Sequence, residues 1–284
     1  MRTEGQSESE NVEDRRRGPA PIAVAGGGLG TIVLVILVLA LGGDPTKLLQ
    51  DVARNGPAVN AGEPGEETPE EAEAARFVKI VLKDTEDVWD DVFARAGKTY
   101  EKPVLVLYSR STDTACGFGQ AAMGPFYCPA DRKVYLDLSF FEDLKRRYKA
   151  PGDFAQAYVV AHEVGHHVQN LLGISDSVHR RQRGLSKAAA NDLSVRLELQ
   201  ADFLAGVWAY HANEMRSILE SGDVDEALTC AASIGDDRLQ RKARGHVVPD
   251  SFTHGTSEQR QRWFKRGLKT GDMNAGDTFN TDDL

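Results

Sequence analysis

Two histidines four residues apart flank a glutamate in the segment His162-Glu163-Val164-Gly165-His166. Residues four apart lie on one face of a helix, so both imidazoles can bind one metal ion. Zinc suits this pair, because it binds imidazole nitrogen at about 2.0–2.1 Å and accepts three protein ligands plus a water molecule. Glu163 lies beside that face, where it can take a proton from the activated water and pass it to a leaving amine. The pattern therefore predicts a hydrolytic zinc site.

The motif is specific for a sequence of this composition. With seven His and 43 Asp or Glu among 284 residues, chance gives such a motif about 0.03 times per chain. The competing interpretation is a solvated or structural pair of histidines on a helix, and the low chance frequency disfavours it.

A zinc site of this kind needs a third protein ligand. His167 is the nearest in sequence, but it lies about 100° around the helix from His166 and faces elsewhere. Glu198 is the better candidate, because it lies in a helical segment and completes a set of two histidines and one glutamate. Asp202 shares the face of Glu198 and can accept the second N–H of a ligating histidine. Alone, both carboxylates would be interpreted as solvated, but beside an incomplete zinc motif they predict one metal centre.

Peptide hydrolysis also needs a hydrogen-bond donor for the developing oxyanion. His254 is the candidate, because it precedes a predicted helix N-terminus. The helix dipole disfavours a positive charge there, and a neutral imidazole still donates one hydrogen bond. Tyr135, Tyr210 and His211 are rival donors, and a loop histidine without a role is an equally acceptable interpretation.

The elements expected to carry these residues form a mainly helical α+β domain with a small sheet, from residue 76 to residue 284. Strands are predicted at residues 104–108 and 134–138, and the second could bind an extended peptide at its edge. Apolar periodicity predicts helices over residues 154–172, 187–219 and 224–244. Thr256 and Gln259 predict a capping box that begins a last helix.

The chain before the domain has a different composition. Residues 1–21 are polar and are expected to form a disordered tail. Residues 22–41 carry no charge and predict one transmembrane helix, with a cleaved signal peptide as the alternative. The arginines at 15–17 predict that the tail is cytoplasmic and that the domain of this single-pass membrane protein lies across the cell membrane. Residues 42–75 are rich in Gly, Pro and Glu and predict a flexible linker.

Charge and cysteine content narrow the possible partners. The net charge of −9 argues against nucleic acid as a partner. Cys116 and Cys128 are close in sequence and are expected to form a disulfide in an oxidising compartment, with two reduced thiols as the alternative. Cys230 is left over and is expected to be buried in a helix.

Several stretches of the chain carry a family resemblance: residues 11–16, 42–45, 115–117, 126–129, 162–169, 198–202 and 249–260. Together they resemble the bacterial YpfJ-like family of neutral zinc metallopeptidases over nearly the whole chain. The resemblance implies an N-terminal membrane segment and a thermolysin-like (gluzincin) zinc site, with Glu198 as ligand and Asp202 behind it. The N-terminal tail is less rich in glycine than the family pattern. The resemblance implies no particular physiological substrate.

The residues together predict a zinc-dependent metallopeptidase that acts on peptide or protein substrates. His162, His166 and Glu198 would bind Zn²⁺, and Glu163 would act as general base and acid. The alternative is a membrane-tethered binding or assembly module with a structural or vestigial zinc site. Glu163 separates the two, because a structural zinc site has no use for an acid–base carboxylate. A zinc hydrolase of non-peptide amides in the cell envelope is a third possibility.

Overall fold

The structure, a computed structural model, describes residues 1–17 and 67–284. Residues 18–66 lie outside the described part of the chain, and they include the predicted membrane segment 22–41 and most of the predicted linker. Among the described residues, no helix is long and apolar enough to cross a bilayer. The membrane segment therefore stays a prediction.

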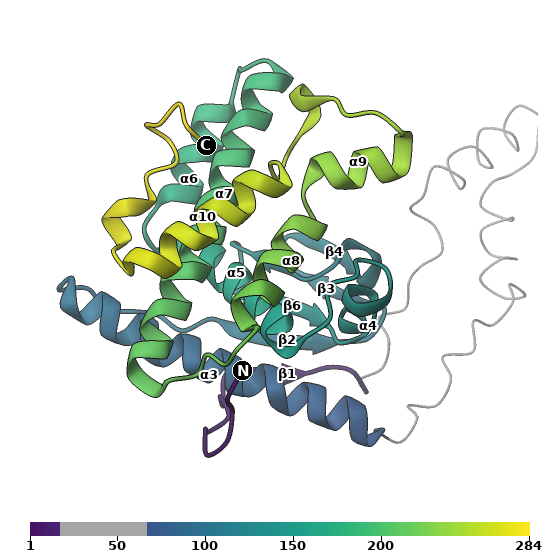
Figure 1. The fold of residues 1–284 in the computed structure, drawn as a ribbon, viewed down its shortest axis with the longest axis vertical. Coiled ribbons are helices and arrows are strands. Elements are labelled where there is room, and N and C mark those ends of the chain that lie inside the picture. The colour runs from purple at the N-terminus through teal and green to yellow at the C-terminus, as the bar shows by residue number, and fades with distance from the viewer. Residues whose placement is uncertain (18–66) are drawn as a thin grey trace, which may run out of the picture. The chain divides into compact units, whose positions relative to one another are not determined.

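A four-stranded mixed sheet forms one layer of the fold (Figure 1). Its strand order is β1–β2–β6–β5, in which β1, β2 and β6 run parallel and β5 runs antiparallel to β6. The strands of this sheet are β1 (Val12–Asp14), β2 (Val104–Tyr108), β5 (Phe126–Cys128) and β6 (Lys133–Asp137). A separate hairpin is formed by β3 (Ser111–Thr114) and β4 (Gly117–Gln120).

The two predicted strands are confirmed as β2 and β6, but the predicted role of the second is wrong. β6 lies between β2 and β5, so its edges are already paired and no peptide can add to it. Within the described residues, β5 is the edge strand on that side of the sheet. The disulfide between Cys116 and Cys128 joins β5 to the turn after β3, and Cys230 is free and buried.

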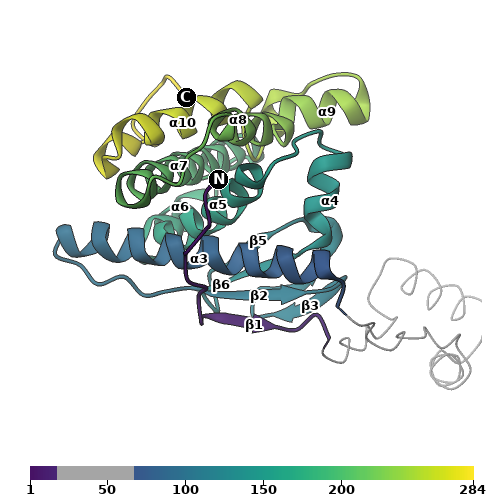
Figure 2. The ribbon, with the colours of Figure 1, turned by 60° about the horizontal axis from the view of Figure 1, so that its bottom comes forward.

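Helices cover one side of the sheet, which lies at the bottom of Figure 2. The α-helices are α3 (Pro69–Arg95), α4 (Ser139–Arg146), α5 (Asp153–Leu171), α6 (Ile174–Gln182), α7 (Lys187–Arg216), α8 (Asp223–Ser233), α9 (Asp236–Arg244) and α10 (Ser257–Thr270). Short 3-10 helices are η1 (Ala121–Met123), η2 (Pro249–Ser251) and η3 (Met273–Gly276). The predicted mainly helical α+β fold is confirmed. Helix α3 begins before the predicted domain start, because Thr68 and Glu71 form a capping box.

The predicted helix over residues 224–244 is two helices, α8 and α9, which separate at Gly235. A Cβ atom on Gly235 would lie 2.5 Å from the backbone nitrogen of Ser257, the first residue of α10. Glycine therefore lets the bend between α8 and α9 lie directly against the start of α10. Asp236, the first residue of α9, accepts hydrogen bonds from the backbone N–H groups of residues 253–255. The break therefore fixes the loop that precedes α10.

The N-terminal segment packs on the domain, so the predicted disorder of the polar tail is wrong. β1 pairs with the edge of β2, and the N–H of Leu105 donates to the carbonyl of Asn11 at 2.9 Å. The side chains of Ser9 and Asn11 donate to the buried carboxylate of Glu86 at 2.6 and 2.8 Å. Composition did not predict the order of this segment, because backbone and polar hydrogen bonds hold it in place and it has no large apolar face.

The pairing of β1 with β2 also constrains membrane topology. Backbone hydrogen bonds join the two strands, so both lie in the same compartment while the sheet is intact. A cytoplasmic tail with the domain across a membrane would require β1 to leave the sheet.

Candidate active site

His162 and His166 lie on α5, Glu198 lies on α7, and the structure brings the three side chains together. Gly165, inside the motif, permits this approach. A Cβ atom on Gly165 would lie 3.0 Å from the backbone oxygen of Ala201 on α7. A larger residue would require α7 to give way by a few tenths of an ångström, so the motif's glycine lets α7, which carries the third candidate ligand, lie close to α5.

The three side chains are spaced like ligands of one zinc ion. Nε2 of His162 lies 3.2 Å from one carboxylate oxygen of Glu198, and Nε2 of His166 lies 3.4 Å from the other. Two ligand atoms of a tetrahedral zinc ion, each about 2.05 Å from the metal, are about 3.3 Å apart. The donor types and their spacing therefore fit zinc.

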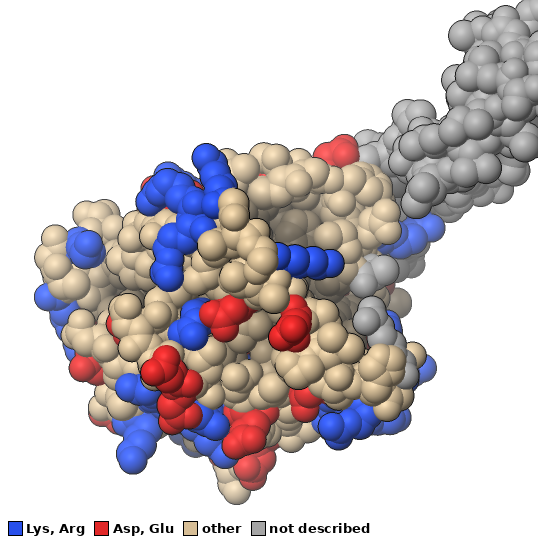
Figure 3. Space-filling view, turned by 90° about the horizontal axis from the view of Figure 1, so that it is seen from above, with Lys and Arg blue, Asp and Glu red and all other residues tan. Residues whose placement is uncertain are grey.

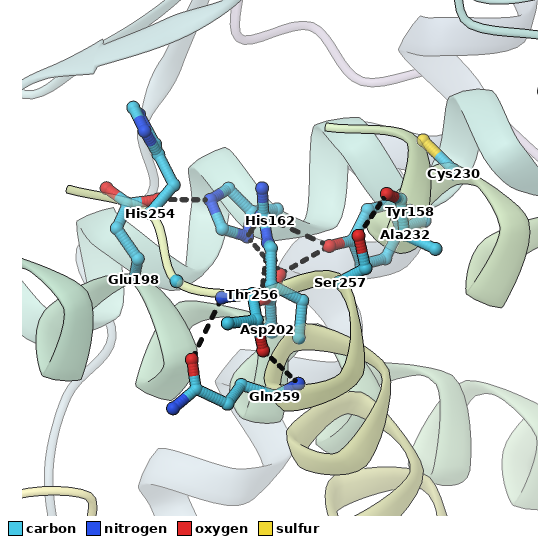
Figure 4. A network of polar contacts seen from close by, with 12 residues as sticks. Tyr158, His162, Glu198, Asp202, Cys230, Ala232, His254, Thr256, Ser257 and Gln259 are labelled. Carbon is cyan, nitrogen blue, oxygen red and sulfur yellow. Dashed lines mark hydrogen bonds and ion pairs between the residues drawn. The ribbon is translucent and has the colours of Figure 1, made fainter. Parts of the chain in front are cut away.

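Asp202 fixes the ring of His162 (Figure 4). Nδ1 of His162 donates to Asp202 at 2.8 Å, so Nε2 faces Glu198 and is the nitrogen left for a metal ion. The same carboxylate accepts hydrogen bonds from Nε and Nη2 of Arg260 at 2.8 and 2.9 Å, and from the hydroxyl of Tyr158. Asp202 is 0% exposed and Arg260 is 2% exposed, so they form a buried ion pair behind the ligands.

A chain of amides fixes the ring of His166. Its Nδ1 donates to the side-chain oxygen of Gln169 at 2.9 Å. The amide nitrogen of Gln169 donates to the carbonyl of Leu197 at 2.7 Å and to Gln200 at 3.1 Å, which assigns the orientation of the amide. Gln200 in turn donates to the carbonyl of Gly276 at 3.0 Å. Nε2 of His166 therefore also faces the third ligand and is the nitrogen left for a metal ion.

Sequence reasoning missed Arg260, Tyr158 and Gln169, although two of them carry a signal. Arg260 shares a face of α10 with the buried residues Trp263 and Phe264. A cation on the apolar face of a helix predicts a buried anionic partner. Gln169 follows the second histidine of the motif by three residues, so the two share a helix face. Tyr158 gave no comparable signal.

His167 lies outside the ligand set, as predicted. Its Nε2 donates to the carbonyl of Glu101 at 2.5 Å, and its Nδ1 accepts from the hydroxyl of Tyr127 at 3.0 Å. Burial lowers the pKa of His167, which keeps the ring neutral. This histidine therefore joins α5 to β5 and to the chain before β2.

The carboxylates of Glu198 and Asp202 lie at hydrogen-bond distance from the two imidazoles and favour a positive charge at this site. Burial alone would lower the pKa of His162, but the carboxylates of Asp202 and Glu198 outweigh it and raise this pKa to about 10. Burial alone would raise the pKa of Glu198, but His166 and His162 hold it well below its usual range. A divalent cation would replace the protons that the two imidazoles otherwise retain.

A cleft of about 480 Å³ opens onto the three ligands, and Glu163 and His254 also line it. Glu163 is 8% exposed, and its side chain makes no hydrogen bond to any other described residue. Its carboxylate is therefore available to a molecule in the cleft. The rival donors Tyr135, Tyr210 and His211 do not line this cleft.

His254 lies in the loop before α10, with Nδ1 at 3.4 Å from the carboxylate of Asp236. This contact raises the pKa of His254, although burial opposes it. The dipole of the following helix predicted a neutral ring, and that prediction is wrong in direction. The charge of Asp236 outweighs the dipole, because it is in direct contact with the ring.

Comparison with known proteins adds the family. The family described as "Putative neutral zinc metallopeptidase" matches residues 1–279. The chain belongs to this family. Protein YpfJ of Escherichia coli strain K12 is 57% identical over 212 residues, which cover 75% of this chain and 74% of YpfJ. Protein Mb2605 of Mycobacterium bovis is 43% identical over 223 residues, which cover 75% of this chain and 74% of that protein.

Both relatives are named as uncharacterised proteins, and no solved structure matches this chain. Membership of the neutral zinc metallopeptidase family confirms the resemblance predicted from the sequence. The grouping of His162, His166 and Glu198 fits the metal that the family description names.

Proposed function

We propose that the protein is a zinc-dependent metallopeptidase that hydrolyses peptide bonds in peptide or protein substrates. The observation that carries this proposal is the position of Glu163, which lines an open cleft beside three side chains spaced as zinc ligands. A structural zinc site has a closed ligand shell and no use for a free carboxylate next to it. The arrangement therefore supports hydrolysis over a purely structural metal.

The proposed reaction assigns a proton transfer to Glu163. Zinc held by His162, His166 and Glu198 would lower the pKa of a water molecule to about 7 and polarise the substrate carbonyl. Glu163 accepts the proton of the attacking water as the oxygen bonds to the carbonyl carbon. It then gives this proton to the nitrogen as the C–N bond breaks, which leaves an amine and a carboxylic acid, and the acid loses the remaining proton of the water to become a carboxylate.

His254 is proposed as the donor to the oxyanion. Asp236 orients the ring through Nδ1 and keeps it protonated to a higher pH than a free imidazole. Nε2–H is then free to donate to the charge that develops on the carbonyl oxygen.

The edge strand β5 supports the binding of an extended peptide. Phe126 and Tyr127 of β5 line the cleft. The outer side of this strand has no partner strand among the described residues, so its backbone groups can pair with a substrate.

A single crossing of the membrane by residues 22–41 would separate β1 from β2. The proposal therefore keeps membrane association through these residues but replaces the single-pass arrangement, and it places residues 1–16 and the peptidase domain in one compartment. Single cysteines introduced at the exposed residues Glu4 and Lys269 test this with a membrane-impermeant thiol reagent in intact cells. Both positions should label, or neither should, and labelling of only one would contradict the shared compartment.

Metal analysis and peptide cleavage by the wild type and by Glu163→Gln test the proposed reaction. Both proteins should bind one zinc ion, and only the wild type should cleave. Equal cleavage by the variant would exclude the role of Glu163. Zinc binding without cleavage by either protein, over a broad peptide library, would favour a binding or assembly module with a structural zinc ion.

A further inference from the structure

Cations border the mouth of the candidate active-site cleft. Tyr148, His179 and Leu239 line the cleft and belong to three separate segments: the turn after α4, helix α6 and helix α9. Each has basic neighbours. We define the basic rim as the exposed side chains of Arg147, Arg180, Arg183, Arg238 and Lys242.

Helix α6 contributes the densest part of the basic rim. Residues 174–187 contain four Lys or Arg and one carboxylate. Arg180 directly follows the cleft-lining residue His179, and Arg183 caps the C-terminal end of α6 in an extended conformation. Both residues are exposed and lie within four positions of His179 in the chain.

Helix α9 and the end of α4 supply the rest and meet each other. Lys242 is three residues after Leu239, and its Nζ donates to the carbonyl of Arg147 at 3.2 Å. The guanidinium of Arg147 lies over the ring of Tyr148, 5.5 Å from its centre. Lys242 of α9 and Arg147 at the end of α4 therefore lie close together, next to the cleft-lining residues Leu239 and Tyr148.

The charges of the basic rim are not compensated within the described part of the chain. None of its five members forms an ion pair with a described carboxylate. Asp236 and Asp237, which begin α9, bind backbone N–H groups and Ser257 instead. The chain as a whole carries −9, so unpaired cations concentrated here run against its average composition.

The view from above shows the same feature (Figure 3). Helices α6 and α9 lie toward the top of Figure 1, and blue side chains gather beside a hollow in the face that looks upward. Red side chains lie on the other side of the hollow, with further blue side chains among them.

We infer that the protein acts on acidic peptide segments, with Asp or Glu residues flanking the bond that is cleaved. This inference rests on the proposed peptidase function and names its substrate class. Complementary charge raises the rate of encounter and holds the flanks of the substrate, whereas like charge rejects basic segments. The cleft carboxylates Glu163 and Glu198 are engaged in the reaction and do not select the flanks.

Cleavage of three peptides that share one core and carry Glu, Gln or Lys flanks tests the inference. At low salt, kcat/KM of the wild type should be about tenfold higher for the Glu-flanked than for the Gln-flanked peptide. The difference should appear mainly in KM, and salt at about 0.5 M should remove most of it by screening. The variant Arg180→Gln/Arg183→Gln/Arg238→Gln should lose the preference.

A matched control neutralises three exposed cations away from the cleft, Lys98→Gln/Lys265→Gln/Lys269→Gln. This control should keep the preference of the wild type. Equal kcat/KM for all three peptides, or a preference that the basic-rim variant retains, would overturn the inference. The proposed function survives that result, because cleavage itself is still observed.

If the wild type cleaves none of the peptides, the proposed function fails, and peptide binding then tests the inferred preference for acidic segments. The same peptides, labelled with a fluorophore, are titrated into zinc-loaded Glu163→Gln with and without the basic-rim substitutions. Tighter binding of the Glu-flanked peptide, lost without the basic rim, supports the inference, and equal binding refutes it. Binding of phosphatidylglycerol vesicles through the basic rim, with no charge preference among peptides, would make it a lipid-binding surface and refute the inference.

Discussion

Replacing Asp202 by Asn should weaken both folding and zinc binding. The carboxylate of Asp202 is fully buried and binds His162, Arg260 and Tyr158. Asn would leave the buried guanidinium of Arg260 without a counter-charge, and breaking a buried pair in this way costs about 3–5 kcal/mol. The variant would also lose control of the tautomer of His162, which typically lowers metal affinity by about 10–100-fold.

A double-mutant cycle separates the two effects. Arg260→Gln should cost about 3–5 kcal/mol as well, because it leaves Asp202 without a counter-charge. Asp202→Asn/Arg260→Gln removes both charges, so its loss of unfolding free energy should be smaller than the sum of the single losses by at least about 2 kcal/mol. Zinc affinity should fall whenever the carboxylate is missing, whatever residue occupies position 260.

Urea unfolding in the presence of a chelator measures the stability of the four proteins, and competition with a coloured chelator measures their zinc affinity. Losses of the expected size are a large part of the roughly 5–15 kcal/mol that stabilises a typical domain, so the change in unfolding free energy should be well resolved. Additive stability losses would refute the buried ion pair. Unchanged zinc affinity in Asp202→Asn would refute its role behind His162.

Three further variants test the site and the fold. Asp236→Asn removes the carboxylate that raises the pKa of His254, so the basic limb of the pH profile of kcat/KM should move to lower pH; an unchanged limb would exclude His254 as the titrating donor. Because that pKa is raised on folding, its contribution to stability is present below about pH 6.5 and is lost as the pH rises through the folded value, and the variant should lack this dependence in unfolding experiments. Gly165→Ala should lower zinc affinity in chelator competition, because the added Cβ would lie 3.0 Å from the backbone oxygen of Ala201 and would displace α7, which carries Glu198. Wild-type affinity would contradict this coupling. Ser9→Ala removes a donor to Glu86 and should lower the free energy of unfolding in urea by about 1.5–3 kcal/mol, whereas a disordered tail would leave it unchanged.

Local periodicity explains which parts of the fold could be predicted. The helix that carries His162 and His166, the strands β2 and β6, and the capping box of Thr256 and Gln259 all depend on residues within a few positions of one another. The break at Gly235 could not be predicted in this way. It depends on the contact with Ser257, which is distant in sequence.

The prediction of a disordered N-terminal tail was wrong for a related reason. Its composition is that of a solvated tail, and only the exposed edge of β2 and the buried carboxylate of Glu86 give it partners. A strand that is stabilised by backbone hydrogen bonds leaves little trace in composition or periodicity.

The period of the α-helix dictates that two imidazoles share one helix face with a glutamate beside them. Glu198 and Asp202 could be predicted as well, since a zinc site needs a third ligand and a partner for its histidines. The ion pair of Arg260 with Asp202, the contact of Gln169 with His166 and the effect of Asp236 on the pKa of His254 are visible only in the folded protein. Those pairings depend on the distance and angle at which α5, α7 and α10 pack together, and on the bend between α8 and α9, and no local period specifies them.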